Sequence, residues 1–151
     1  MRYVWVLCIL FSCATIAQQK EKDAVKASIE LFFEGFHAQD SMVIKSVLAP
    51  EAVMQRIGED AEGIATVVPQ KISAFLKSIV SIPKTTTFQE KIMSYAIQID
   101  GNMANAWTPY EFWRNDAFSH CGVNSFQLFK EQETWKIIYI VDTRRIDNCS
   151  K

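Results

Sequence analysis

The chain has 151 residues, 49% of them apolar, and a formal net charge of −1. That length suits one domain, and the apolar share suits a globular core. Basic and acidic residues are interspersed, so the chain lacks the basic stripe with which proteins bind a phosphate backbone. We therefore expect no nucleic-acid partner.

The first 17 residues have the pattern of a secretory signal peptide. Arg2 gives a positive start, and the residues from Val4 to Phe11 are apolar. The segment ends at Ala17, with small residues at the positions that a signal peptidase recognises. The apolar run is too short to span a bilayer. We expect cleavage after Ala17, a single mature domain over residues 18–151, and export to the periplasm or the medium without stable membrane insertion.

The cysteines suggest lipidation as an alternative to simple cleavage, and they predict a disulfide. Cys13 follows Leu-Phe-Ser, which loosely resembles a lipobox, so lipidation at Cys13 is the alternative, although a bulky Phe11 fits that motif poorly. Cleavage would leave only Cys121 and Cys149, and two cysteines in an exported domain most often pair. Two free thiols are the other possibility. The chain has no Cys-x-x-Cys or His-Glu-x-x-His spacing, so we expect no metal site and no cofactor.

Three helices are predicted in the first half of the chain. The first runs from Glu21 to Ala38, and the second, from Ser41 to Leu48, begins after Asp40, which can cap it. The third begins near Pro69, and the segment 51–63 between them has no clear period. Apolar residues recur at helical spacing at Val25, Ile29, Phe32 and Phe36 in the first helix and at Ile72, Phe75, Leu76 and Ile79 in the third.

From Phe88 onward the pattern is typical of strands. Asp100-Gly101 predicts a two-residue hairpin, Asn115-Asp116 a second, and Glu131-Gln132 a weaker third. Helices followed by an antiparallel meander are an α+β arrangement.

The predicted turns set the pairing register, and the register sets the face on which each side chain lies. The less polar face should cover the helices, and in this register it places Glu111 beside His120, with Asn124 in the next row. The same face carries Trp107, Phe118, Phe126, Leu128, Trp135, Ile137, Tyr139, Val141 and Thr143. The outer face carries Tyr110, Phe112, Ser119, Cys121, Ile138, Ile140, Asp142 and Arg144. A β-bulge would shift some of these rows.

Several segments resemble a known superfamily. Residues 32–40 look like the first helix, with its acidic stop, of the nuclear transport factor 2 (NTF2)-like superfamily, and residues 135–137 look like its last strand. Residues 107–112, 119–122 and 142–145 are similar to exported bacterial members described as lumazine-binding. The superfamily also contains polyketide cyclase-like and ketosteroid isomerase-like proteins. The resemblance implies a cone-shaped, strongly curved antiparallel sheet wrapped around about three N-terminal helices, a pocket at its wide end, and homodimers through the outer sheet face.

Three functions are compatible with these patterns. The first is an exported domain that binds a small apolar or planar molecule in an aromatic pocket, with Asn124 orienting the ligand. The aromatic candidates for this pocket, which could equally be plain core, are Phe32, Phe36, Trp107, Trp113, Phe118 and Tyr139. Another function is that of an interaction protein that works through the outer sheet face, whose apolar residues also suggest the dimer interface.

The remaining function is that of a cofactor-free lyase or isomerase. Glu111 beside His120 would fix one imidazole tautomer and raise the basicity of the ring, as acid–base catalysis requires. The structural alternative is a buried polar cluster whose groups bond one another. Arg144 and Arg145 either hold an anion at the rim of the cone or are solvated charges. Binding is preferred to catalysis, because no family active-site constellation matches these residues.

Overall fold

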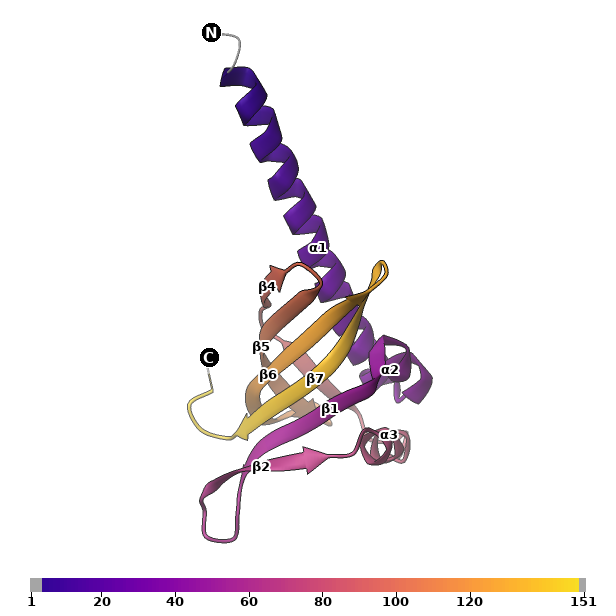
Figure 1. Cartoon of the computed structure of the whole chain (residues 1–151). Helices are drawn as coiled ribbons and strands as arrows, with labels where there is room; N and C mark the ends of the chain where they lie inside the picture. Colours follow the sequence, from indigo (N-terminus) through magenta and orange to yellow (C-terminus); the bar gives the residue numbers. More distant parts are fainter. Residues whose placement is uncertain (1–3, 150–151) are drawn as a thin grey trace.

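The computed structural model describes residues 4–149, so Met1 and Arg2 of the expected signal peptide lie outside the described residues. Three helices and seven strands lie in this range (Figure 1). The helices are α1 (Val4–Ala38), α2 (Ser41–Val47) and α3 (Ile72–Val80). The strands are β1 (Leu48–Glu59), β2 (Ala65–Gln70), β3 (Phe88–Ile92), β4 (Ala96–Asp100), β5 (Met103–Arg114), β6 (Ala117–Glu131) and β7 (Thr134–Arg145).

One strongly curved sheet wraps around the C-terminal half of α1, while the N-terminal half of that helix projects beyond the sheet (Figure 1). The strand order is β2-β1-β7-β6-β5-β3, and β4 also pairs with β5. Only the β1–β7 pair is parallel; the others are antiparallel. The predicted α+β class and curved sheet around helices are confirmed.

The core lies between α1 and the concave face of the sheet. Val25, Ile29 and Phe33 of α1 are buried there against Phe126 and Trp135 of the sheet. At the start of this contact, Glu21 accepts hydrogen bonds from Lys130 Nζ at 2.8 Å and Trp135 Nε1 at 3.1 Å. These bonds fix α1 to the β6–β7 hairpin, so the helix has a set position in the cone.

Local signals predicted the boundary between the first two helices well, but they predicted the next segment and the start of the first helix poorly, since α1 begins at Val4 and not at Glu21. The first helix ends at Ala38 as predicted, and the Asp40 side chain accepts bonds from the backbone N–H groups of Met42 and Val43, which caps α2. Residues 51–63, which show no clear period, instead lie largely in β1. Pro69 belongs to β2, not to a helix start, and α3 begins at Ile72.

Two of the three predicted turns are displaced. Asn115 and Asp116 form the predicted turn, with positive φ at both residues. The first hairpin turns at residues 101–102 and the last at residues 132–133, because Asp100 pairs with Met103 and Glu131 with Thr134.

Two β-bulges then change the register. One leaves Ser119 without a partner in β5, and the other leaves Ile138 without a partner in β6. An extra residue moves all later side chains of a strand to the other face. The predicted assignment of faces is therefore wrong in part: Tyr110, Phe112, Ile140, Asp142 and Arg144 lie on the inner face, and Trp107, Glu111, Tyr139, Val141 and Thr143 lie on the outer face.

The predicted pairing of the two remaining cysteines is confirmed. Cys121, buried on the outer side of β6, forms a disulfide with Cys149, and their Cα atoms are 5.8 Å apart. The bond fixes the C-terminal segment after β7 to the convex side of the sheet.

Candidate functional site

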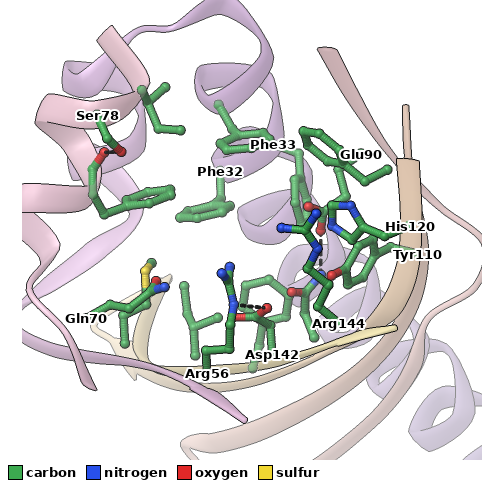
Figure 2. Close-up of a pocket in the computed structure, with 18 of the residues that line it drawn as sticks. Phe32, Phe33, Arg56, Gln70, Ser78, Glu90, Tyr110, His120, Asp142 and Arg144 are labelled. Carbon is green, nitrogen blue, oxygen red and sulfur yellow. Dashed lines mark hydrogen bonds and ion pairs between the residues drawn. The ribbon is translucent and has the colours of Figure 1, made fainter. Parts of the chain in front are cut away.

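A cavity of about 650 Å³ lies between the helices and the concave face of the sheet (Figure 2). Its helical side comes from α1 and α3, and its opposite side comes from β1, β2 and β7, with β3, β5 and β6 closing one end. The apolar lining consists of Phe32, Phe33, Phe36, Met54, Pro69, Ala74, Phe75, Ile79, Tyr110, Phe112, Phe126 and Ile140. The charged lining consists of Arg56, Lys71, Glu90, Arg114, Asp142 and Arg144.

Three phenylalanines form the aromatic roof of the cavity. Phe75 of α3 is nearly parallel to Phe32 and Phe36 of α1, with interplanar angles of 3° and 6° and centroid distances of 6.1 Å. Phe32 and Phe36 are one helical turn apart, so they present their rings side by side. The roof is thus a flat apolar surface built from two helices.

Glu90 is the polar group that the sequence patterns missed. It lies between Phe88 and Ile92 in β3 and shares their inward face, as the alternation along a strand requires. Its carboxylate accepts a 2.7 Å hydrogen bond from Asn124 Nδ2. Burial, with a smaller contribution from the nearby Asp142, raises the pKa of Glu90 to about 7 against the opposing effect of this hydrogen bond.

A second polar pair forms the floor of the cavity. Arg56 Nε of β1 donates to Asp142 Oδ2 of β7 at 2.9 Å, across the parallel β1–β7 pair (Figure 2). Burial raises the pKa of the Asp142 carboxyl, although Arg56 opposes that shift. The two terminal nitrogens of Arg56 have no hydrogen-bond partner among the described residues.

His120 is buried in the cavity wall and is not paired with a carboxylate. Its ring stacks on Phe112 with 4.8 Å between centroids, and its Nδ1 lies 3.1 Å from Ser119 Oγ. Burial, together with the positive charges of Arg144 and Arg56, lowers the pKa of His120 to about 4. The imidazole is therefore neutral at pH 7.

The predicted Glu111–His120 dyad is wrong in its geometry. The bulge at Ser119 sets His120 opposite Phe112 and sets Glu111 opposite Cys121 on the outer face. There the Glu111 carboxylate accepts a 3.0 Å bond from Trp113 Nε1. His120 has cationic neighbours in place of the expected carboxylate, so its environment lowers its basicity.

Tyr110 owes its position in the wall to a glycine on the next strand. Its partner across the β5–β6 ladder is Gly122, and a Cβ there would lie 2.8 Å from the Tyr110 ring and overlap the Thr143 carbonyl oxygen. The ring crosses the glycine, and its hydroxyl donates to that same carbonyl oxygen at 2.9 Å. A side chain at position 122 would prevent this arrangement.

The structure divides the predicted site residues between two faces. Four of them line the cavity, namely Phe32, Phe36, His120 and Asn124. The other five lie on the outer face, namely Trp107, Glu111, Trp113, Phe118 and Tyr139. Arg56 and Glu90 were missed, and Asp142 and Arg144 were placed on the wrong face. An acid at an apolar-face position between Phe88 and Ile92 is a signal that could have identified Glu90.

Within residues 4–149, no group of three or more His, Cys, Asp or Glu side chains is arranged to hold a metal ion. Over the same range, no helix has both the length and the apolar character that crossing a membrane requires.

Comparison with known proteins identifies the fold. No protein-family model and no curated protein matches the chain. An NTF2-like protein of unknown function from Shewanella baltica is 18% identical, with a TM-score of 0.60 over 83% of this chain and 94% of that one. An NTF2-like protein with a cystatin-like fold from Novosphingobium aromaticivorans is 10% identical, with a TM-score of 0.67 over 90% and 88%. One of unknown function from Pseudomonas putida is 11% identical, with a TM-score of 0.66 over 86% and 90%.

Identities this low show the fold alone. The particular likeness to exported lumazine-binding proteins stays a prediction. The curved sheet, the helices on its concave side and these three structures together establish that the chain has the NTF2-like fold.

Proposed function

We propose that the protein is a small-molecule-binding domain whose ligand lies between the aromatic roof and the charged floor of the cavity. The observation that carries this proposal is a hollow of about 650 Å³ with stacked phenylalanines on one side and Arg56, Asp142 and Glu90 on the other. Ligand pockets have this size and this combination of apolar walls with a few convergent polar groups.

An ordinary core gives a poorer account of the same residues. Protein interiors are close-packed, with few voids larger than a water molecule, whereas this cavity separates Phe75 from the residues of the sheet. The Arg56 side chain is 40% exposed and its terminal nitrogens have no partner among the described residues, so they are accessible to an occupant of the cavity. A hollow with accessible donors of this kind supports a bound occupant.

A matched pair of variants tests the binding proposal. A panel of flat aromatic and heteroaromatic compounds is screened by thermal shift, and native mass spectrometry of the freshly purified protein looks for a retained ligand. Phe75→Ala should weaken binding of any hit at least about tenfold, since Phe75 forms the roof. Phe118→Ala removes an aromatic ring from the outer face and should leave affinity unchanged. A panel without hits, or equal effects of the two substitutions, would contradict the proposal.

Acid–base catalysis is the second candidate function, and Glu90 is the observation that favours it. A carboxyl with a pKa of about 7 in a ligand-sized cavity can accept and return a proton near neutral pH. Asn124 fixes the position of its carboxylate. Glu90 thus takes the role first considered for Glu111 with His120, in a lyase or isomerase that needs no cofactor.

Deuterium exchange separates catalysis from binding. A carbonyl compound found in the binding screen is incubated with the protein in D₂O, and mass spectrometry follows deuterium at the carbon beside the carbonyl. Catalysis predicts exchange above the background rate that disappears in Glu90→Gln while binding persists. Exchange at the background rate in the wild-type protein would leave binding as the function.

Export and dimerisation belong to the same proposal. Cleavage after Ala17 would leave Glu21, which anchors α1 to the β6–β7 hairpin, as the fourth residue of the mature chain. The helix before this anchor projects from the sheet (Figure 1), so its loss would leave the core intact. N-terminal sequencing of the exported protein tests this, and an N-terminus at Gln18 is expected.

A homodimer is proposed through the outer sheet face, around residues that differ from those first considered. Tyr110, Phe112 and Ile140 lie inside and cannot contribute. The outer face of β5 and β6 instead exposes Trp107 by 53% and Phe118 by 42%. Exposed aromatic side chains of this size are frequent in protein interfaces.

A further inference from the structure

We infer that the ligand is a flat organic monoanion whose carboxylate is bound by Arg56 and Arg144. This inference rests on the proposed binding function and specifies the chemical class of the ligand. The observations that carry it are the charge of the cavity lining, the hydrogen-bonding state of the two arginines, and the shape of the aromatic roof.

The cavity has an excess of positive charge. Its lining contains four basic residues, Arg56, Lys71, Arg114 and Arg144, and two acidic ones, Glu90 and Asp142. The whole chain has nearly balanced charge, with 16 basic and 17 acidic residues, so the excess is local. A hollow with this local balance favours an anionic occupant over a cationic one.

Arg56 is held in a way that leaves its binding end free. Asp142 accepts a hydrogen bond from Nε, which fixes the direction of the guanidinium plane. Both terminal nitrogens then point into the cavity (Figure 2) and have no partner among the described residues. A guanidinium presents its donors in a planar fork that fits the two oxygens of a carboxylate.

Arg144 supplies a second cation from the same strand as Asp142. It makes no ion pair or side-chain hydrogen bond within the described residues, and it extends into the cavity beside His120 (Figure 2). Arg56 and Arg144 therefore flank the polar part of the cavity with unused donors.

The acidic residues and the roof restrict the anion further. Where the two arginines lie, Asp142 offsets one of their two positive charges, so a monoanion balances the charge that is left and a dianion such as a phosphate monoester exceeds it. Above the arginines, the parallel rings of Phe32, Phe36 and Phe75 offer a flat apolar surface. A planar body with one carboxylate satisfies both the roof and the floor.

A set of probes with one body and different charges tests the inference. Isothermal titration calorimetry at pH 7 compares 2-naphthoate, neutral 2-naphthamide and the dianion 2-naphthyl phosphate. We expect 2-naphthoate to bind at least about tenfold more tightly than either of the others. Arg56→Gln and Arg144→Gln should each weaken 2-naphthoate about tenfold and leave 2-naphthamide nearly unchanged.

Arg145→Gln is the matched control, because Arg145 is next to Arg144 in sequence but pairs with Cys121 on the outer face. This substitution should leave the affinities for all three probes unchanged. Arg144→Gln also guards against a folding artefact, since it breaks no ion pair of the described residues, whereas Arg56→Gln leaves Asp142 unpaired. Thermal melting verifies that each variant is folded.

The outcomes separate this inference from the proposed function. If 2-naphthamide binds as tightly as 2-naphthoate, or if Arg145→Gln weakens 2-naphthoate as much as Arg144→Gln does, the anion inference is overturned and the binding domain stands. Tighter binding of 2-naphthyl phosphate would overturn the choice of a monoanion. If none of the three probes binds, the proposed function and the inference fail together.

Discussion

Asn124 on β6 donates a 2.7 Å hydrogen bond to Glu90 on β3, across the intervening strand β5. The two residues are 34 positions apart in sequence. Their bond joins one end of the sheet to its centre and holds a carboxyl group in the wall of the cavity. Because the carboxyl is desolvated there, its protonation is linked to the stability of the fold.

The first prediction concerns Glu90→Gln. Burial raises the pKa of Glu90 from 4.5 to about 7, so the folded state keeps a proton that the unfolded state loses. The free energy of unfolding of the wild type should fall relative to that of Glu90→Gln as the pH rises from about 4.5 to about 7, by at most about 3 kcal/mol. Above pH 7 the difference should stay constant. Urea unfolding across this range measures it.

Glu111→Gln is the control for this experiment, because it makes the same substitution on the outer face. A stability curve of Glu90→Gln that runs parallel to that of the wild type from pH 4.5 to 7 would contradict the desolvation of Glu90.

The second prediction concerns His120→Gln and has the opposite sign. Burial lowers the pKa of His120 from 6.5 to about 4, so the unfolded state takes up a proton first as the pH falls. The wild type should lose stability relative to His120→Gln between about pH 6.5 and pH 4, by about 1–3 kcal/mol. NMR titration of the ring protons gives the pKa directly. A pKa above 6.5 would instead indicate a carboxylate partner.

The third prediction concerns Gly122→Ala. The added Cβ would overlap the Thr143 carbonyl oxygen and press on the Tyr110 ring, so strand and ring must both move. We expect a loss of about 3 kcal/mol in the free energy of unfolding. Gly58→Ala is a milder strand substitution, because its nearest contact is a Val68 side-chain carbon at 3.3 Å. Equal losses in the two variants would show that the backbone at Gly122 adapts freely.

The fourth prediction concerns the outer face. Trp107→Glu places a charge within the proposed dimer interface and should convert a dimer to a monomer in light scattering. Met42→Glu adds the same charge on exposed α2, away from the sheet, and should leave the dimer intact. A monomeric wild type, or a dimer that survives Trp107→Glu, would reject this interface.

Interactions close in sequence were predictable. The end of α1 at Ala38, the Asp40 cap and the turn at Asn115-Asp116 follow from side chains that bond or tolerate the local backbone within a few residues. The α+β class and the superfamily resemblance follow from patterns spread over many residues, which tolerate local errors. The disulfide was predictable because only Cys121 and Cys149 remain after the expected cleavage.

The composition of the cavity could not be predicted with the same tools. Ser119 and Ile138 are the extra residues of the two bulges, and the alternation of polar and apolar residues along the strands does not reveal them. Each bulge nevertheless reverses the face of the side chains beyond it. That reversal turned Glu111 outward and brought Asp142 and Arg144 inward. Arg56 reaches the site through a parallel pairing of β1 with β7 that no local pattern signals.

The sequence by itself thus determined the end of α1, the start of α2, a tight turn, the fold class and the crosslink, since short-range contacts or composition decide each of them. Only the tertiary structure decided which polar groups share the cavity. Glu90, Arg56, Asp142 and Arg144 meet because strand order, register and two bulges act together over long sequence separations. A shift of one residue in any pairing would have assembled a different site.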